Sequence, residues 1–204
     1  MTIDSIFFNI DKDYFSSVIR LKGLKAPHIY AKVNSEMDLE KWDKAFGFQP
    51  MDLKGKYSIH LLAEGNYARS VVPKGLRGTD TVVSSIPQFT LRSSLANGYF
   101  KYSSLPQAVE NISFNLNASC PDHNYKHTSL SVENLNASVL NNFIKGFFKM
   151  GNSKDFPIHA QLQSIFNLAD IKHFYPLDSL TLAGNLDIDV QTNGKYIPAK
   201  RYFR

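Results

Sequence analysis

Alternation of apolar and polar residues is the feature that most limits the folds open to this chain. Every second residue is apolar or small in 29–39 and 51–63, and the pattern recurs in 89–95, 112–118, 158–168 and 180–190. A period of two places one set of side chains on one face of a strand. One apolar and one polar face is typical of an antiparallel sheet with one wet side. The chain is therefore predicted to be mainly β.

Composition narrows the class further. The 204 residues are 43% hydrophobic and include 15 Phe and 10 Tyr, which argues against disorder. No apolar run is long enough to span a bilayer. The basic residues of this +5 chain are scattered and gather only in the final "KYIPAKRYFR", which disfavours nucleic-acid binding. A single cysteine excludes a disulfide framework.

The chain also matches itself without gaps when residue 29 is set on residue 158. "IYAKVNSEMDL" then falls on "IHAQLQSIFNL", and "LKGKYSIHLLAEGNY" on "LAGNLDIDVQTNGKY". We call this spacing of 129 residues the self-match offset. Most of the identical pairs that it relates, such as Ser35 with Ser164 and Gly55 with Gly184, fall on the apolar phase of the alternation. The sequence predicts one β-rich repeat region: residues 1–28 end one unit, 29–157 form a whole unit, and 158–204 begin the next. We expect a fragment of a longer protein.

Two or three short helices interrupt the strands. Asp38 and Asn167 are good N-caps, Gly47 and Pro176 are natural stops, and apolar residues recur between them at helical spacing. The stretch "SSLPQAVEN" is a further candidate for one helical turn. Residues 69–85, "RSVVPKGLRGTDTVVSS", are interpreted as a long loop.

Motifs for catalysis are not found. The chain has no nucleophile elbow, phosphate loop or zinc-protease motif. Cys120, His123 and His127 have ligand-type side chains, but three at most, in "CPDHNYKH", are fewer than a zinc site needs, and a hairpin loop is favoured. Asp187 and Asp189 lie on a polar face, which favours solvation over acid–base work. We expect no enzyme activity, no metal and no cofactor.

An apolar sheet face must be covered. The sheet can close into a sandwich, or it can curl into a taco-like β-groove that holds an apolar ligand. The alternation alone does not decide between these two folds. Units added edge to edge would instead extend the face into a channel for acyl chains. The residues predicted to line such a groove are Ile29, Val33, Met37, Leu53, Tyr57, Ile59, Leu61, Phe89, Leu91, Ile112, Phe114, Leu116, Ile158, Leu162, Phe166, Leu182, Leu186, Ile188 and Val190.

Several stretches resemble the AsmA family of bacterial envelope proteins, in particular its large Bacteroidetes members. The most specific are "NGYFKYSSLP" followed by "VENISFNL", with "DLKGKYSIHLLAEGNY" and the region from "DFPIHAQLQ" to "NGKYIP" beside them. The resemblance implies a periplasmic segment of a protein anchored in the inner membrane by a helix outside this chain. It implies a link to outer-membrane assembly and lipid supply, as for TamB-like and bridge-like lipid transfer proteins, and no catalytic residues.

The leading hypothesis is therefore a non-enzymatic envelope segment whose curved antiparallel sheet holds the acyl chains of a phospholipid or similar lipid. Its other expected partners are neighbouring repeats of the same chain and envelope proteins. The alternative is a structural or protein-docking β-module, with a closed sandwich, inside a larger envelope protein.

Overall fold

The structure is a computed structural model that describes residues 2–75, 78–152, 155–173 and 182–196. Ten strands form one sheet in the order β1-β2-β3-β4-β7-β8-β9-β10-β11-β12, with every neighbouring pair antiparallel. Their bounds are β1 (Thr2–Ile10), β2 (Asp13–Lys22), β3 (His28–Asp38), β4 (Met51–Asn66), β7 (Gln88–Tyr102), β8 (Val109–Cys120), β9 (Ser129–Val139), β10 (Asn142–Met150), β11 (Pro157–Asn167) and β12 (Asn185–Lys195).

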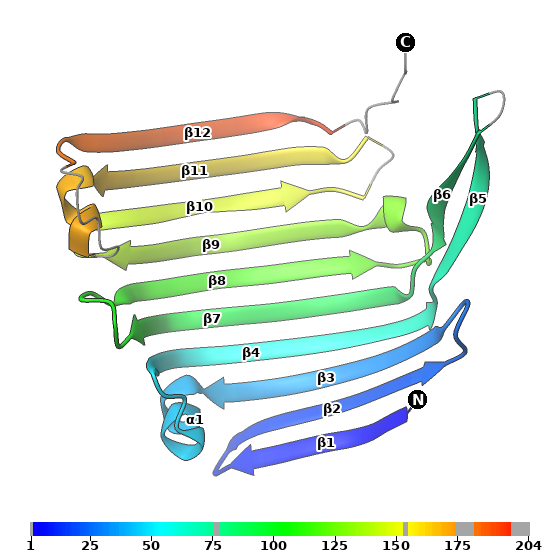
Figure 1. Cartoon of the computed structure of the whole chain (residues 1–204), viewed down its shortest axis with the longest axis horizontal. Coiled ribbons are helices and arrows are strands. Elements are labelled where there is room, and N and C mark those ends of the chain that lie inside the picture. The colour runs from blue at the N-terminus through cyan, green and yellow to red at the C-terminus, as the bar shows by residue number, and fades with distance from the viewer. Residues whose placement is uncertain (1, 76–77, 153–154, 174–181, 197–204) are drawn as a thin grey trace.

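The sheet is a single open layer (Figure 1). Within the described residues β1 pairs only with β2, and β12 only with β11, so the sheet does not close on itself. The prediction of a mainly β, antiparallel chain is confirmed. The described part of the chain is not a closed sandwich, because the segments that pack on the sheet are short helices at its end.

Residues 69–85 were wrongly interpreted as a loop. They form most of a two-stranded hairpin of β5 (Ala68–Lys74) and β6 (Gly78–Ser85), which projects from the sheet between β4 and β7 (Figure 1). Pro73 lies within β5, where it is tolerated because both strands of a two-stranded ribbon are edges and can lack an N–H. The β-branched valines on either side of the turn supply the strand propensity.

The helix predicted after Asp38 is confirmed as α1 (Leu39–Phe46). The Asp38 carboxylate accepts a hydrogen bond from the Glu40 backbone N–H at 3.2 Å, and Gly47 ends the helix in the left-handed conformation at φ 62°. Trp42 faces the sheet and is buried. The helix therefore begins and ends where its capping residues indicated.

The second predicted helix is shorter and tighter than expected. It is the 3₁₀ helix η2 (Leu168–His173), and its predicted stop at Pro176 lies outside the described residues. Asn167 caps it by accepting from the Ala169 N–H at 3.0 Å. "SSLPQAVEN" forms a turn and bends over 103–107 and then enters β8 at Val109, so it holds no helix. Another 3₁₀ turn, η1 (Tyr125–His127), lies between β8 and β9. Figure 1 shows α1 and η2 at one end of the sheet and the hairpin at the other.

Two sets of four strands pair in the same register. His28 pairs with Asn66 at the β3–β4 boundary, and their equivalents at the self-match offset, Pro157 and Lys195, pair at the β11–β12 boundary. The β2–β3 and β10–β11 pairs correspond in the same way. A register shift within β1 recurs at the corresponding place in β9. The offset seen in the sequence therefore also relates the pairings of β1–β4 to those of β9–β12.

The strand predicted over 180–190 begins later than expected. β12 starts at Asn185, so Leu182 precedes it, whereas β4 runs through the corresponding Leu53. The physical reason is pairing: Leu53 is paired with Phe100 of β7, and β12 has no described neighbour on that side. A strand end without a partner lacks the hydrogen bonds that would extend it.

Candidate functional site

The sheet register gathers the predicted groove residues on one face. Side chains of directly paired residues point to the same side of a sheet. One row of paired residues runs from β3 to β11: Val33, Leu61, Leu91, Ala118, Leu130, Met150 and Ile158.

Strand alternation places the other predicted residues on the same face, except two. Leu53 lies beyond a bulge at the β4–β7 boundary, and Leu182 precedes β12. The face, which we call the apolar face, therefore includes Ile29, Val33, Met37, Tyr57, Ile59, Leu61, Phe89, Leu91, Ile112, Phe114, Leu116, Ile158, Leu162, Phe166, Leu186, Ile188 and Val190.

The apolar face has no second layer in the described part of the chain. The segments that pack most on the sheet there are α1, against β3 and β4, and η2, against β11. Phe46 of α1 also meets Phe8 of β1, and Asp170 of η2 accepts a hydrogen bond from Asn142 of β10. Most side chains of the face are half-buried by their neighbours on the same face, and the only buried apolar residues described are Trp42 and Cys120. At β12 the face is more open, with Leu186 46% and Val190 53% exposed. Apolar surface of this extent is typical of a binding site rather than of an isolated soluble domain.

Serine hydroxyls on the apolar face are used by the sheet itself. Ser35 is fully buried and donates to the Tyr14 carbonyl oxygen at 2.7 Å. Ser93, which is 7% exposed, donates to the carbonyl oxygen of Ser58 at 3.0 Å. Ser164 repeats the arrangement of Ser35 on β11. These donors are occupied, so the face offers dispersion contacts rather than directional polar ones.

Sequence reasoning missed the role of these serines, although a signal was present. Ser35 and Ser164 are identical at the self-match offset and lie on the apolar phase of their strands. A small polar residue kept on an apolar phase needs a local partner for its hydroxyl. The neighbouring strand's carbonyl group is the nearest acceptor, and the structure supplies it.

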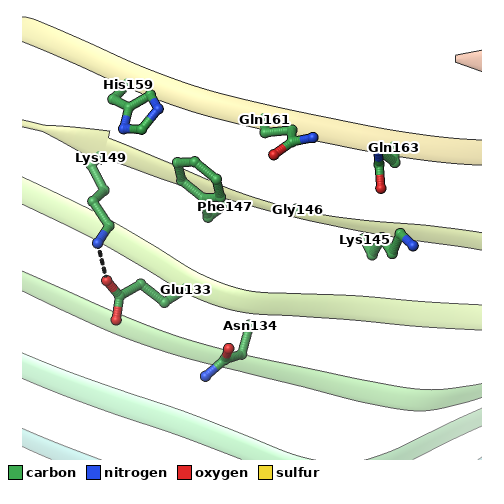
Figure 2. A pocket seen from close by; sticks show the side chains of 9 residues that line it. All are labelled: Glu133, Asn134, Lys145, Gly146, Phe147, Lys149, His159, Gln161 and Gln163. Carbon is green, nitrogen blue, oxygen red and sulfur yellow. Dashed lines mark ion pairs between the residues drawn. The ribbon is translucent and has the colours of Figure 1, made fainter. Parts of the chain in front are cut away.

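The opposite face is mainly polar, although Phe7, Leu62, Phe147 and Ile165 also lie on it. One row of paired residues, from β3 to β11, consists of Asn34, His60, Arg92, Asn117, Ser131, Lys149 and His159. Figure 2 shows a depression on this face over β9, β10 and β11, where Lys149 forms an ion pair with Glu133. Its lining combines charged and amide side chains with the Phe147 ring, which packs against the His159 imidazole, so this face is more polar than the apolar face without being free of apolar groups.

The polar atoms of the cysteine–histidine loop have partners within the loop or, for His123, in the segment before β7, where its Nδ1 lies 3.2 Å from the Ile86 carbonyl oxygen. The buried Cys120 thiol donates to the Asn124 carbonyl oxygen at 3.3 Å, and His127 Nδ1 lies 2.6 Å from Asp122. The hydrogen bond with His127 lowers the pKa of the Asp122 carboxyl group. Among the described residues no group of three His, Cys, Asp or Glu is placed to hold a metal ion. Residues 121–128 connect β8 to β9, as the predicted hairpin loop requires.

No helix in the ranges that the structure describes has the length and hydropathy to cross a bilayer. Comparison with protein-family models, with curated proteins and with solved structures found no match. The AsmA resemblance therefore stays a prediction.

Proposed function

We propose that this chain is a non-enzymatic lipid-binding segment whose apolar face holds the acyl chains of a phospholipid or a similar lipid. The observation that carries the proposal is the division of a ten-stranded open sheet into one continuous apolar face and one polar face. Head groups would stay in water at the rim of the apolar face, and the polar face would remain solvated.

The contacts on the apolar face suit an acyl chain. Each buried methylene contributes about 0.8 kcal/mol, so a segment of ten methylenes gains roughly 8 kcal/mol before the costs of ordering. Because these contacts have no preferred direction, a chain can move along the face without a large barrier at one place. The hydroxyls of Ser35, Ser93 and Ser164 already have acceptors and impose no polar requirement on the ligand.

We further propose that the sheet is built from repeated units and curves into a groove. Support for the repeat comes from equivalent hydrogen bonds at positions related by the self-match offset. The Asp38 N–H donates to the Asp13 carboxylate at 2.8 Å, and the Asn167 N–H donates to the Asn142 side-chain oxygen at 2.5 Å. Successive units of this kind would lengthen the apolar face without changing its chemistry.

The location follows from the resemblance to AsmA-like proteins. We place the segment in the periplasm of a bacterial envelope, as part of an inner-membrane-anchored protein that supports lipid supply and outer-membrane assembly. A long apolar face in an aqueous compartment between two membranes is suited to shielding acyl chains in transit.

A second candidate is a structural or protein-docking module. The open edges at β1 and β12 favour it, because an edge strand presents unpaired N–H and C=O groups to another chain. In that case the apolar face would be covered by protein rather than by lipid.

Native mass spectrometry of the purified chain, with solvent extraction and lipid analysis, separates the two. The proposal expects phospholipid that survives gel filtration and uptake of a fluorescent phospholipid by the lipid-free chain. A lipid-free chain that takes up no phospholipid overturns the lipid proposal. A compact dimer of such a chain in light scattering would support the docking module.

A further inference from the structure

The strands β4 and β12 correspond at the self-match offset but differ in their neighbours. β4 pairs with β3 on one side and β7 on the other. β12 pairs with β11, and no described strand lies on its other side. The occupied edge of β4 therefore shows which kind of strand the free edge of β12 fits.

A glycine of β4 makes room for a bulge in β7. The register between the two strands shifts at Gly55, where β7 has one extra residue. Gly55 adopts φ +125°, and a Cβ added there would lie 2.8 Å from Gly98 Cα and 3.0 Å from the Ala96 carbonyl oxygen. The positive φ and the short distances to β7 both exclude a side chain at Gly55. The bulge of small residues in β7 therefore requires a glycine at this position of β4.

The corresponding positions are Gly184, which precedes β12, and Gly194 in β12, and no described atom lies close to a Cβ added at either of them. Gly184 shares the positive φ of its equivalent, whereas Gly194 does not share the φ of +141° of Gly65. Gly184, the equivalent of Gly55, adopts φ +107°, and a Cβ added there would have no described atom within 4 Å. Gly194 corresponds to Gly65, where an added Cβ would lie 2.6 Å from the His123 imidazole, and Gly194 is as open as Gly184. The φ of Gly184 by itself favours a glycine, and the lack of a described neighbour leaves room for an approaching strand.

We propose that the free edge of β12 is a docking site for an antiparallel strand of the β7 type, supplied by a further unit of the same kind. The inference rests on the repeated-unit part of the proposed function. The β4–β7 register places the equivalents of Leu95, Leu91 and Phe100 opposite Leu186, Val190 and Leu182, with the bulge beside Gly184. Such a strand would cover the exposed end of the apolar face.

Charge favours this occupant over the β12 strand of a second copy. His60 of β4 pairs with Arg92 of β7, and the residue that corresponds to His60 is Asp189. A β7-type strand therefore sets a guanidinium opposite the Asp189 carboxylate on the polar face. A second β12 strand instead brings two more carboxylates, Asp187 and Asp189, and no bulge.

The test adds a synthetic peptide of residues 88–102, the β7 sequence, to the lipid-free chain and follows amide hydrogen exchange by mass spectrometry. We expect exchange in 185–195 to slow by about tenfold at saturating peptide. A scrambled peptide and a peptide of residues 109–120, the β8 sequence, should leave β12 unchanged. Absence of protection at β12, or equal protection by the scrambled peptide, overturns the proposal.

Two variants identify the contact. Gly184→Ala should weaken peptide binding at least tenfold because its Cβ meets the bulge, and Asp189→Lys should weaken it about threefold by placing two cations opposite each other. Because Asp189 is exposed, Asp189→Lys should fold, and it tests the contact if Gly184→Ala fails to fold. If amide exchange in β12 slows when the chain's concentration is raised without peptide, a second copy of the chain occupies the edge, and the proposal is overturned. Because no lipid is present, the result is independent of lipid binding.

Discussion

The hydroxyl of Ser35 donates to the backbone carbonyl oxygen of Tyr14, 2.7 Å away across the β2–β3 boundary. The hydroxyl of Ser164 makes the same contact with Phe143 at 2.9 Å across the β10–β11 boundary. Both serines are almost fully buried on the apolar face, and the self-match offset relates one pair to the other. A hydroxyl held in this way satisfies a carbonyl group that no water can reach easily.

Replacing either serine by alanine should lower the free energy of unfolding by about 1 kcal/mol, the usual net value of such a hydrogen bond. The two variants, Ser35→Ala and Ser164→Ala, should differ little from each other in urea denaturation. Ser84→Ala on the exposed surface of the hairpin is the matched control and should change stability by less than about 0.5 kcal/mol. Equal effects at all three positions would contradict a specific role for the buried hydroxyls.

Gly55→Ala and Gly184→Ala should separate backbone strain from steric contact. Both residues have positive φ, which costs a non-glycine residue about 1–3 kcal/mol. Only at Gly55 does the new Cβ also meet backbone atoms of β7, which adds about 1–3 kcal/mol. Urea denaturation should therefore show the larger loss for Gly55→Ala. A larger loss for Gly184→Ala would mean that its edge is already occupied.

The Asp38 carboxylate should contribute stability that depends on pH. The Lys56 ammonium donates a hydrogen bond to it at 2.5 Å and lowers its pKa below the ordinary value of 3.8. Because the folded pKa is depressed, the contribution is complete above that value and is lost as pH falls through the folded pKa. Lys56 is 69% exposed, so solvent screening keeps the charge contribution small.

Asp38→Asn tests this contribution because Asn167 shows that asparagine can cap at the corresponding position. We expect Asp38→Asn to be less stable than the unaltered chain at pH 7, with a difference that shrinks as pH falls below 3.8 and through the folded pKa, in thermal unfolding at low salt. A difference that stays constant with pH would assign the loss to helix capping rather than to charge.

Ile59→Lys and Leu62→Lys place the same charge on opposite faces of β4. Ile59 lies on the apolar face between Ser35 and Ser93, whereas Leu62 is on the polar face and 52% exposed. A charge among the acyl chains should weaken binding of a fluorescent phospholipid by at least about tenfold, or 1.4 kcal/mol, and Leu62→Lys should change it less than about twofold.

Both variants should remain folded, since no second layer covers Ile59 in the described part of the chain and a lysine can extend its ammonium into water. Circular dichroism and thermal melting check this point. If Ile59→Lys unfolds, Ile188→Lys near the sheet edge gives the same comparison. Unchanged lipid uptake in folded Ile59→Lys and Ile188→Lys would contradict the lipid-binding role of the apolar face.

Long alternating stretches were predictable and short irregular ones were not. The strands around Val33, Ile59 and Leu162 were predicted because their period of two is strong. The strands β1, β2, β9 and β10 were not predicted. In β1, β2 and β10 adjacent apolar residues, such as Phe147 and Phe148, break the alternation, and in β9 a bulge with Asn134 at φ 54° interrupts it. The β5–β6 hairpin was missed since Pro73 and the glycines around its turn resemble loop signals.

The sequence by itself determined the class of fold, the division of the sheet into two faces, the cap of α1 and the self-match offset. These depend on local periodicity and side-chain chemistry, which a sequence states directly. In the ranges that the structure describes, the tertiary structure decided that the sheet stays open, that Ser35 and Ser164 donate to neighbouring carbonyl groups, and that Gly55 is enclosed while Gly184 has no described neighbour. Those outcomes depend on which strand lies beside which, because a strand's own pattern does not specify what covers its face or pairs with its edge.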